Sequence, residues 1–252
     1  MNSLSFKERL AEASLSHKSR LVLALDLSVE DQTLLDSALK VIGLVGDEFA
    51  ALKINYHLLL PLALKDIMCI VKDAHKKGLQ TIADLKLNDI SSTNLAVLKV
   101  LQQAQFDALI VNPIVGYRDA LQQTIDEAHK VRMGVIFLTY MSHKGASEGY
   151  GLRLKTPSSM KPLYTLFAER AIKWGADGLI VGATKPKIIR EVAKLTHNTL
   201  PIFSPGVGKQ GGSALEALKA GATYLIVGRS ILDSPTMLTE ARRLREETWL
   251  EH

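Results

Sequence analysis

The chain alternates short apolar runs with longer amphipathic stretches. Nearly unbroken apolar runs are buried on both faces when they form strands, so they are typical of parallel strands covered by helices. Amphipathic stretches with helical spacing between such runs predict the covering helices. The predicted strands are Leu21–Asp26, Phe49–Ile54, Gln80–Lys86, Asp107–Asn112, Gly134–Thr139, Asp177–Val181, Pro201–Ser204 and Thr223–Gly228.

Helical spacing predicts one helix after each strand and an extra helix at the N-terminus, over Leu4–Ala13. Four glycines, Gly78, Gly134, Gly175 and Gly221, fall where a helix gives way to a strand, as helix-ending glycines do. The helices predicted after the strands are Asp31–Leu44, Ala63–Lys77, Thr93–Gln103, Asp119–Val131, Pro162–Trp174, Lys187–Leu195, Ser213–Ala220 and Pro235–Trp249.

Eight strand-then-helix units predict a single-domain (β/α)₈ TIM barrel over residues 1–252, rather than an open doubly wound sheet. Barrels of this kind carry their reactive groups at the carboxyl ends of the strands. Charged and polar side chains at otherwise apolar strand ends are therefore the candidates for chemistry. They are Asp26, Lys53, Asp84, Lys86, Asn112, Thr139 and Arg229.

The segment from Asp84 to Thr93 carries most of the candidate chemistry. Residues two apart on a strand face the same side, so Asp84 and Lys86 point into the barrel mouth if Ile82 faces the interior. Asp89 follows at the start of the next helix, and Thr93 shares its helical face. A lysine set between carboxylates can stabilise a developing carbanion and then deliver its proton. The alternative is a surface salt bridge with Asp89 as a helix cap.

A second candidate site is the glycine-rich segment Ser204–Gly212, followed by Gly228 and Arg229. It contains a Gly-x-Gly-x-x-Gly match at Gly206–Gly211, which in isolation suggests a dinucleotide fold. That motif belongs in the first strand-to-helix turn, however, and this one follows the seventh strand. Barrels often bind phosphate with the loops after strands seven and eight, where glycine backbones approach an anion and an arginine pairs with it.

Composition narrows the class of protein. The chain is 47% hydrophobic and its first twenty residues are polar, which predicts a soluble protein with no signal peptide and no membrane span. The net charge of +5 favours anionic ligands, but basic residues are interspersed with acidic ones, so no nucleic-acid partner is expected. One cysteine, Cys69, is predicted to be buried and fits a reducing cytoplasm. The histidines lack metal-ligand spacing, so no metal is expected.

Taken together, these residues resemble those of orotidine 5′-phosphate decarboxylases, over about Arg20 to Leu244. The family motif Asp-x-Lys-x-x-Asp-Ile-x-x-Thr is matched in full over Asp84–Thr93, with Ile90 at its isoleucine. The strand ends match at Asp26 and Lys53. The serine after strand five matches Ser142, and the phosphate loop and the Gly-Arg pair match at Pro205, Gly206, Gly208, Gln210, Gly228 and Arg229.

The resemblance implies decarboxylation of orotidine 5′-monophosphate to UMP, the last step of pyrimidine synthesis, with no cofactor. Asp84 would crowd the substrate carboxylate, and Lys86 would protonate C6 after carbon dioxide leaves. Lys53 and Asp89 complete the implied catalytic group. Asp89 and Thr93 would enter the neighbouring subunit's site, which implies a homodimer with shared active sites.

The resemblance also implies a substrate-binding set. Asp26 and Lys53 would hold the ribose hydroxyls, and Ser142 would bind the pyrimidine. Gln210 would link base and phosphate, and Arg229 would bind the phosphate. The full implied set is Asp26, Lys53, Ile90, Thr93, Ser142, Pro205, Val207, Gly208, Gln210, Gly228 and Arg229.

Two alternatives remain open. Related magnesium-dependent enzymes of sugar phosphates, such as 3-keto-gulonate 6-phosphate decarboxylase and hexulose phosphate synthase, share the Asp-x-Lys-x-x-Asp pattern. They place a glutamate where this chain has Lys53, and they lack the Ile-x-x-Thr continuation and the pair of Ser142 and Gln210. A non-catalytic nucleotide-binding barrel is the other alternative. It would have no reason to keep Lys86 between two aspartates.

Overall fold

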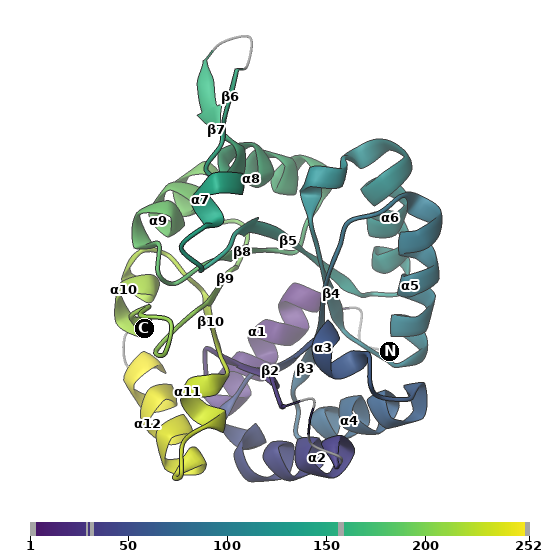
Figure 1. Ribbon diagram of the computed structural model, residues 1–252, viewed down its shortest axis with the longest axis vertical. Coiled ribbons are helices and arrows are strands. Elements are labelled where there is room, and N and C mark those ends of the chain that lie inside the picture. The colour runs from purple at the N-terminus through teal and green to yellow at the C-terminus, as the bar shows by residue number, and fades with distance from the viewer. Residues whose placement is uncertain (1–3, 29, 31–32, 156–158, 250–252) are drawn as a thin grey trace.

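The computed structural model describes residues 4–28, 30, 33–155 and 159–249, and its centre is a closed barrel of parallel strands (Figure 1). Around the barrel the order is β1-β10-β9-β8-β5-β4-β3-β2. The predicted barrel and its predicted strands are confirmed. The strands are β1 (Leu21–Ala24), β2 (Ala51–Asn55), β3 (Gln80–Leu87), β4 (Ala108–Val111), β5 (Gly134–Tyr140), β8 (Gly178–Val181), β9 (Ile202–Pro205) and β10 (Tyr224–Val227).

Helices surround the barrel, as Figure 1 shows, and the predicted ones are present. The predicted start of the first at Asp31 lies outside the described residues. The predicted start at Asp119 is wrong, because Asp119 has a φ of 55° in a short π-helical turn, η3 (Tyr117–Leu121). The helices are α2 (Leu34–Val45), α4 (Leu64–Lys76), α5 (Ser91–Gln103), α6 (Gln122–Lys130), α8 (Leu163–Trp174), α9 (Pro186–Leu195), α10 (Ala214–Lys219) and α12 (Met237–Trp249).

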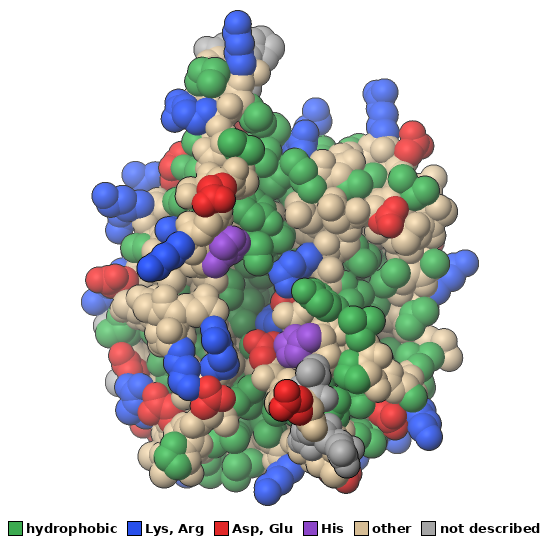
Figure 2. Space-filling model, viewed as in Figure 1, with side chains coloured by type: hydrophobic (Ala, Val, Ile, Leu, Met, Phe, Trp, Pro, Cys, Tyr) green, Lys and Arg blue, Asp and Glu red, His purple; other side chains and the backbone are tan. Residues whose placement is uncertain are grey.

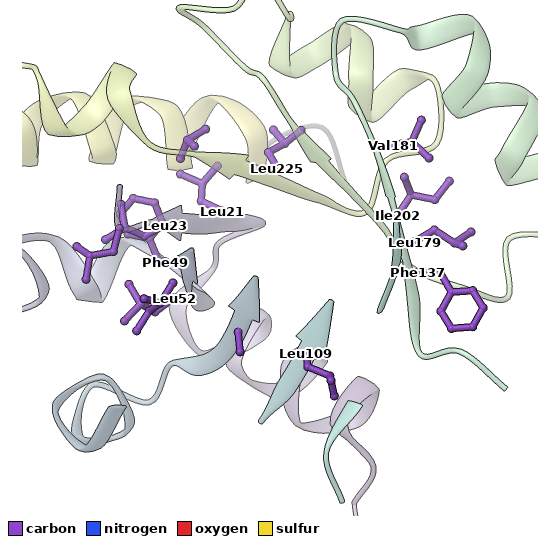
Figure 3. Close-up of a cluster of buried hydrophobic side chains, with 14 of the residues drawn as sticks. Leu21, Leu23, Phe49, Leu52, Leu109, Phe137, Leu179, Val181, Ile202 and Leu225 are labelled. Atoms are coloured by element: carbon purple, nitrogen blue, oxygen red, sulfur yellow. The ribbon is translucent and has the colours of Figure 1, made fainter. Parts of the chain in front are cut away.

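Successive strand residues divide between two apolar clusters. Leu21 and Leu23 pack outward against the helices, in the cluster drawn in Figure 3. Val22 and Ala24 belong to a second cluster, which fills the barrel interior. Ile82 lies in that interior cluster as well, and this establishes which face of β3 looks into the barrel.

Helix α1 (Phe6–His17) lies across the amino-terminal end of the barrel and runs four residues beyond its predicted end at Ala13 (Figure 1). Its Phe6 and Leu10 belong to the interior cluster. Gly134 begins β5, as its predicted strand does, but it lacks the positive φ expected of a helix-ending glycine, and a Cβ on it would lie 2.3 Å from the Phe6 ring. This glycine is therefore required by close packing against Phe6. The other three predicted helix-ending glycines have the expected positive φ.

The pattern did not predict several short elements between the barrel strands and helices. A hairpin of β6 and β7 projects from the barrel beside α8 (Figure 1). Short elements of three to five residues carry too few positions to show a period, which is why they were missed. They include α3 (Tyr56–Leu59), η2 (Pro113–Val115), α7 (Ala146–Gly149), β6 (Arg153–Lys155), β7 (Met160–Pro162) and α11 (Arg229–Leu232).

Two sequence expectations concern the surface. Cys69 is exposed on α4, so its predicted burial is wrong: its side chain lies beside the buried stripe of Ile70, Val71 and Ala74 rather than within it. Among the described residues, no helix is both long and apolar enough to cross a membrane.

Candidate active site

A cavity opens at the carboxyl ends of the barrel strands, and Figure 2 shows acidic and basic side chains around the hollow on this face. Most of the predicted site residues line it together, although they come from distant parts of the chain. The predicted residues that line the cavity are Asp26, Lys53, Asp84, Lys86, Ser142, Pro205, Val207, Gln210, Gly228 and Arg229.

The deepest polar feature of the cavity is a row of alternating charges. Lys53 Nζ lies 2.9 Å from Asp84 Oδ2, and Lys86 Nζ lies 2.7 Å from Asp84 Oδ1. Asp26 Oδ1 lies 3.6 Å from Lys53 Nζ, which is an ion-pair distance beyond hydrogen bonding. Lys53 and Asp84 are each only 5% exposed, so this pairing has little screening by water.

A bulge in β3 brings Asp84 and Lys86 to the same mouth. The register with β4 shifts between Ala83 and Leu87, and Lys86 has a φ of 51°. Ile82 faces the interior and Leu85 packs outward, as the alternation predicted. A positive φ at a lysine is uncommon and costs on the order of 1–3 kcal/mol. The surrounding fold therefore holds Lys86 in a conformation that its own backbone does not favour.

The ion pairs determine the charge of the buried row. Burial alone lowers the pKa of Lys53, but Asp84 and Asp26 outweigh it, so this pKa is raised. Burial alone raises the pKa of Asp84, but Lys53 and then Lys86 outweigh it, so this pKa is lowered. These shifts favour an ionised Asp84 carboxylate beside a protonated Lys53 ammonium at neutral pH.

On the opposite side of the mouth, the loop after β5 meets the glycine-rich loop after β9. Ser142 Oγ donates a hydrogen bond of 2.7 Å to Gln210 Oε1. A Cβ on Gly206 would lie 2.8 Å from Ser142 Cβ, so only a glycine at 206 permits this approach. Gly208 does not line the cavity; its N–H donates to Gly212 O at 2.9 Å, which closes the loop on itself.

Four polar or flexible residues that were not predicted also line the cavity: Asn55, Met141, Lys209 and Ser230. Asn55 lies two positions after Lys53 on β2 and so shares its face. The alternation of strand residues could therefore have predicted Asn55 at the mouth. Ser230 follows Arg229 directly. Its Oγ is buried and has no hydrogen-bond partner in the described chain.

Some predicted residues lie outside the cavity. Asp89, Ile90 and Thr93 are exposed at the start of α5, and none of them lines the cavity of its own chain in the part that the structure describes. Ile90 is the helix N-cap, so the alternative of Asp89 as the cap is wrong.

Two of the strand-end candidates make structural contacts instead of lining the cavity. Thr139 is buried and donates to Phe137 O, and Asn112 caps η2 by accepting from Ile114 N.

No group of three or more histidine, cysteine, aspartate or glutamate side chains suited to a metal ion occurs within the described ranges. The acidic side chains at the mouth, Asp26 and Asp84, are both paired with lysine ammonium groups. The cavity therefore has the glycine-rich loop and Arg229 on one side and a lysine–carboxylate row on the other. These features define a barrel enzyme for a phosphorylated substrate that undergoes proton or carbanion chemistry.

The chain belongs to the orotidine 5′-phosphate decarboxylase / HUMPS family, whose model matches residues 19–244. It is 36% identical over 227 residues to the orotidine 5′-phosphate decarboxylase of Pyrococcus abyssi, covering 90% of this chain and 98% of that protein. It is 32% identical over 230 residues to the orotidine 5′-phosphate decarboxylase of Methanococcoides burtonii, covering 91% of this chain and 97% of that protein.

Solved structures give the same fold. The orotidine 5′-monophosphate decarboxylase of Methanocaldococcus jannaschii, complexed with the inhibitor BMP, superposes with a TM-score of 0.76 and 32% identity over 90% of this chain and 96% of that one. The UMP synthase of Leishmania donovani superposes with a TM-score of 0.83 and 25% identity over 98% of this chain. The present chain spans 56% of the length of that larger protein.

Proposed function

We propose that this protein, folded as a single barrel domain, decarboxylates orotidine 5′-monophosphate to UMP without a cofactor. The observation that carries the proposal is the row of Lys53, Asp84 and Lys86 at the mouth, where a carboxylate is bound by two ammonium groups. Family membership and relatives of nearly the same length support it.

In this reaction the bond between C6 of the pyrimidine and its carboxylate breaks, and the electron pair stays on C6. Asp84 would lie against the departing carboxylate. The Lys86 ammonium would stabilise the negative charge that develops on C6 and then transfer its proton there. Carbon dioxide is the leaving group. Because Lys53 also binds Asp84, Asp84 stays ionised and in place while Lys86 gives up its proton.

The rest of the cavity would bind the nucleotide. Asp26 and Lys53 would hold the ribose hydroxyls, and Ser142 would bind the pyrimidine. Gln210, bonded to Ser142, would reach from base to phosphate. The guanidinium of Arg229, which lines the cavity, would pair with the phosphate. The backbone around that phosphate would come from Pro205, Val207 and Gly228, which line the cavity, while Gly208 would support the loop through its bond to Gly212.

The proposal includes a homodimer with shared sites. Asp89, Ile90 and Thr93 match the family motif but are exposed and lie outside the cavity of their own chain. Large apolar side chains are exposed after the ends of three neighbouring strands, β2, β3 and β4; they are Tyr56, Leu60, Ile90 and Ile114. A second copy covering this face would bury them and receive Asp89 in its site.

The proposed compartment is the cytoplasm. The exposed thiol of Cys69 suits the reducing conditions there.

The test is to mix the purified protein with orotidine 5′-monophosphate and follow the loss of its ultraviolet absorbance. We expect turnover that survives exhaustive chelation with EDTA, because Lys53 stands where the magnesium-dependent relatives place a glutamate, and a lysine there would repel a cation. No loss of substrate would refute the proposal. Loss of activity with EDTA, restored by magnesium, would favour the sugar-phosphate alternative.

A further inference from the structure

Asn94 is a polar side chain that is fully buried on the first turns of α5. Its exposed fraction is 0%, and its Nδ2 donates a hydrogen bond of 2.7 Å to the backbone carbonyl of Asp89. The helix itself uses the next carbonyl, since Asn94 N donates to Ile90 O at 3.1 Å. The Asn94 side chain therefore extends the hydrogen bonding of α5 one residue back, into the segment that carries Asp89.

Ordinary helix capping does not account for this side chain. The N-cap of α5 is Ile90, and Asn94 lies four residues further along, beyond the positions from which a side chain caps a helix. Its Oδ1 is also buried without a hydrogen-bond partner in the described chain. An unpaired buried carbonyl oxygen is destabilising. A leucine of similar size would avoid that cost. We therefore attribute the asparagine at this position to the hydrogen bond that its Nδ2 donates to Asp89 O.

The bond to Asn94 is one of two that fix the conformation of Asp89. The Asp89 side chain is exposed, so packing within its own chain does not hold it. Its Oδ1 accepts a hydrogen bond of 2.7 Å from Ile90 N, and its carbonyl is bound by Asn94. Together the two bonds fix the peptide between Asp89 and Ile90, and with it the direction of the carboxylate.

We propose that Asn94 is a positioning residue, which fixes Asp89 in the conformation needed in the active site of the neighbouring subunit. The inference rests on the role proposed above for Asp89. Asn94 would hold Asp89 in the required conformation before the two subunits associate. A catalytic group misplaced by about 1 Å can cost about a hundredfold in rate. Asn94→Leu should therefore lower kcat by at least about tenfold while changing KM less.

The test is a double-mutant cycle between Asn94→Leu and Asp89→Ala. If Asn94 acts through Asp89, the Asn94→Leu loss seen in the wild-type chain should shrink to less than about twofold in the Asp89→Ala chain. Equal losses in both backgrounds would overturn the inference. Leu98→Ala on the same helix is the structural control, since Leu98 is a buried apolar side chain of the core. It should lower the melting temperature and leave kcat of the folded enzyme unchanged.

Asn94→Ala serves as a second variant if Asn94→Leu does not fold, with the same expectation. Mixed dimers give an independent readout: Asn94→Leu paired with Lys86→Ala should regain activity, because one site then receives neither lesion. A wild-type rate for Asp89→Ala alone would overturn the role of Asp89 and this inference with it. An impaired Asp89→Ala beside a wild-type rate for Asn94→Leu would overturn the inference about Asn94 only.

Discussion

The Lys53 ammonium lies 2.9 Å from one carboxylate oxygen of Asp84, while the other oxygen binds Lys86. The two lysines differ in their surroundings. The Lys53 side chain is 6% exposed and that of Lys86 is 25% exposed, so Lys86 is the more accessible of the two to a substrate entering the mouth. Lys53 would keep the buried carboxylate compensated if Lys86 were removed.

Removal of Lys86 should therefore abolish turnover without unfolding the protein. Lys86→Ala removes the proposed proton donor, and we expect kcat to fall by many orders of magnitude. UMP should still bind, because the glycine-rich loop and Arg229 are unchanged. Calorimetric binding of UMP beside the absorbance assay checks both expectations. A near-normal rate in Lys86→Ala would refute the role assigned to this lysine.

Arg229→Ala tests the phosphate subsite. A charge-assisted hydrogen bond is worth about 1.5–3 kcal/mol, so kcat/KM for the nucleotide should fall by at least about tenfold. Binding energy at the remote phosphate can lower the barrier at C6 as well as improve affinity. The nucleoside that lacks the phosphate is the matched control and should be nearly indifferent to the substitution. Equal losses for the two substrates would show that Arg229 is not the phosphate ligand.

The shared site can be tested with mixed dimers of Lys86→Ala and Asp89→Ala, each expected to be nearly inactive alone. In a mixed dimer one site receives both lesions and the other receives none. Random exchange of equal amounts makes about half of the dimers mixed, so about a quarter of the normal activity should return. Co-expression with two affinity tags verifies the pairing. Verified mixed dimers that stay inactive would mean that Asp89 acts within its own chain.

Gly134→Ala tests the packing of α1 against the barrel. The added Cβ would meet the Phe6 ring at 2.3 Å, and overpacking of this kind costs about 1–3 kcal/mol. Gly43→Ala is the matched control, because Gly43 lies in α2 with nothing within 4 Å of the added atom. That control should be neutral or stabilising by up to about 1 kcal/mol. Urea unfolding of the two variants should shift the midpoint down for Gly134→Ala only.

The sequence by itself determined the barrel, because each strand is a short apolar run and each helix has an amphipathic period. It also determined most of the mouth. Residues two apart on a strand share a face, so the sequence alone assigns Asp84 and Lys86 to one side. The glycine-rich run after the seventh strand and Arg229 after the eighth were likewise assigned to this mouth from their order along the chain, and the structure places Gly206 and Arg229 in the cavity lining.

Only the tertiary structure decided which side chains meet across the barrel. The contacts of Lys53 with Asp84 and of Ser142 with Gln210 join residues 31 and 68 positions apart, and no local period reports such distances. The same holds for Gly134, where a glycine is needed because the Phe6 ring of a distant helix packs against it. Asn94 belongs here too: along the chain it is one more polar residue in a helix, and only its burial and its bond to Asp89 O distinguish it. Local pattern determines elements, whereas burial and pairing are properties of the closed barrel.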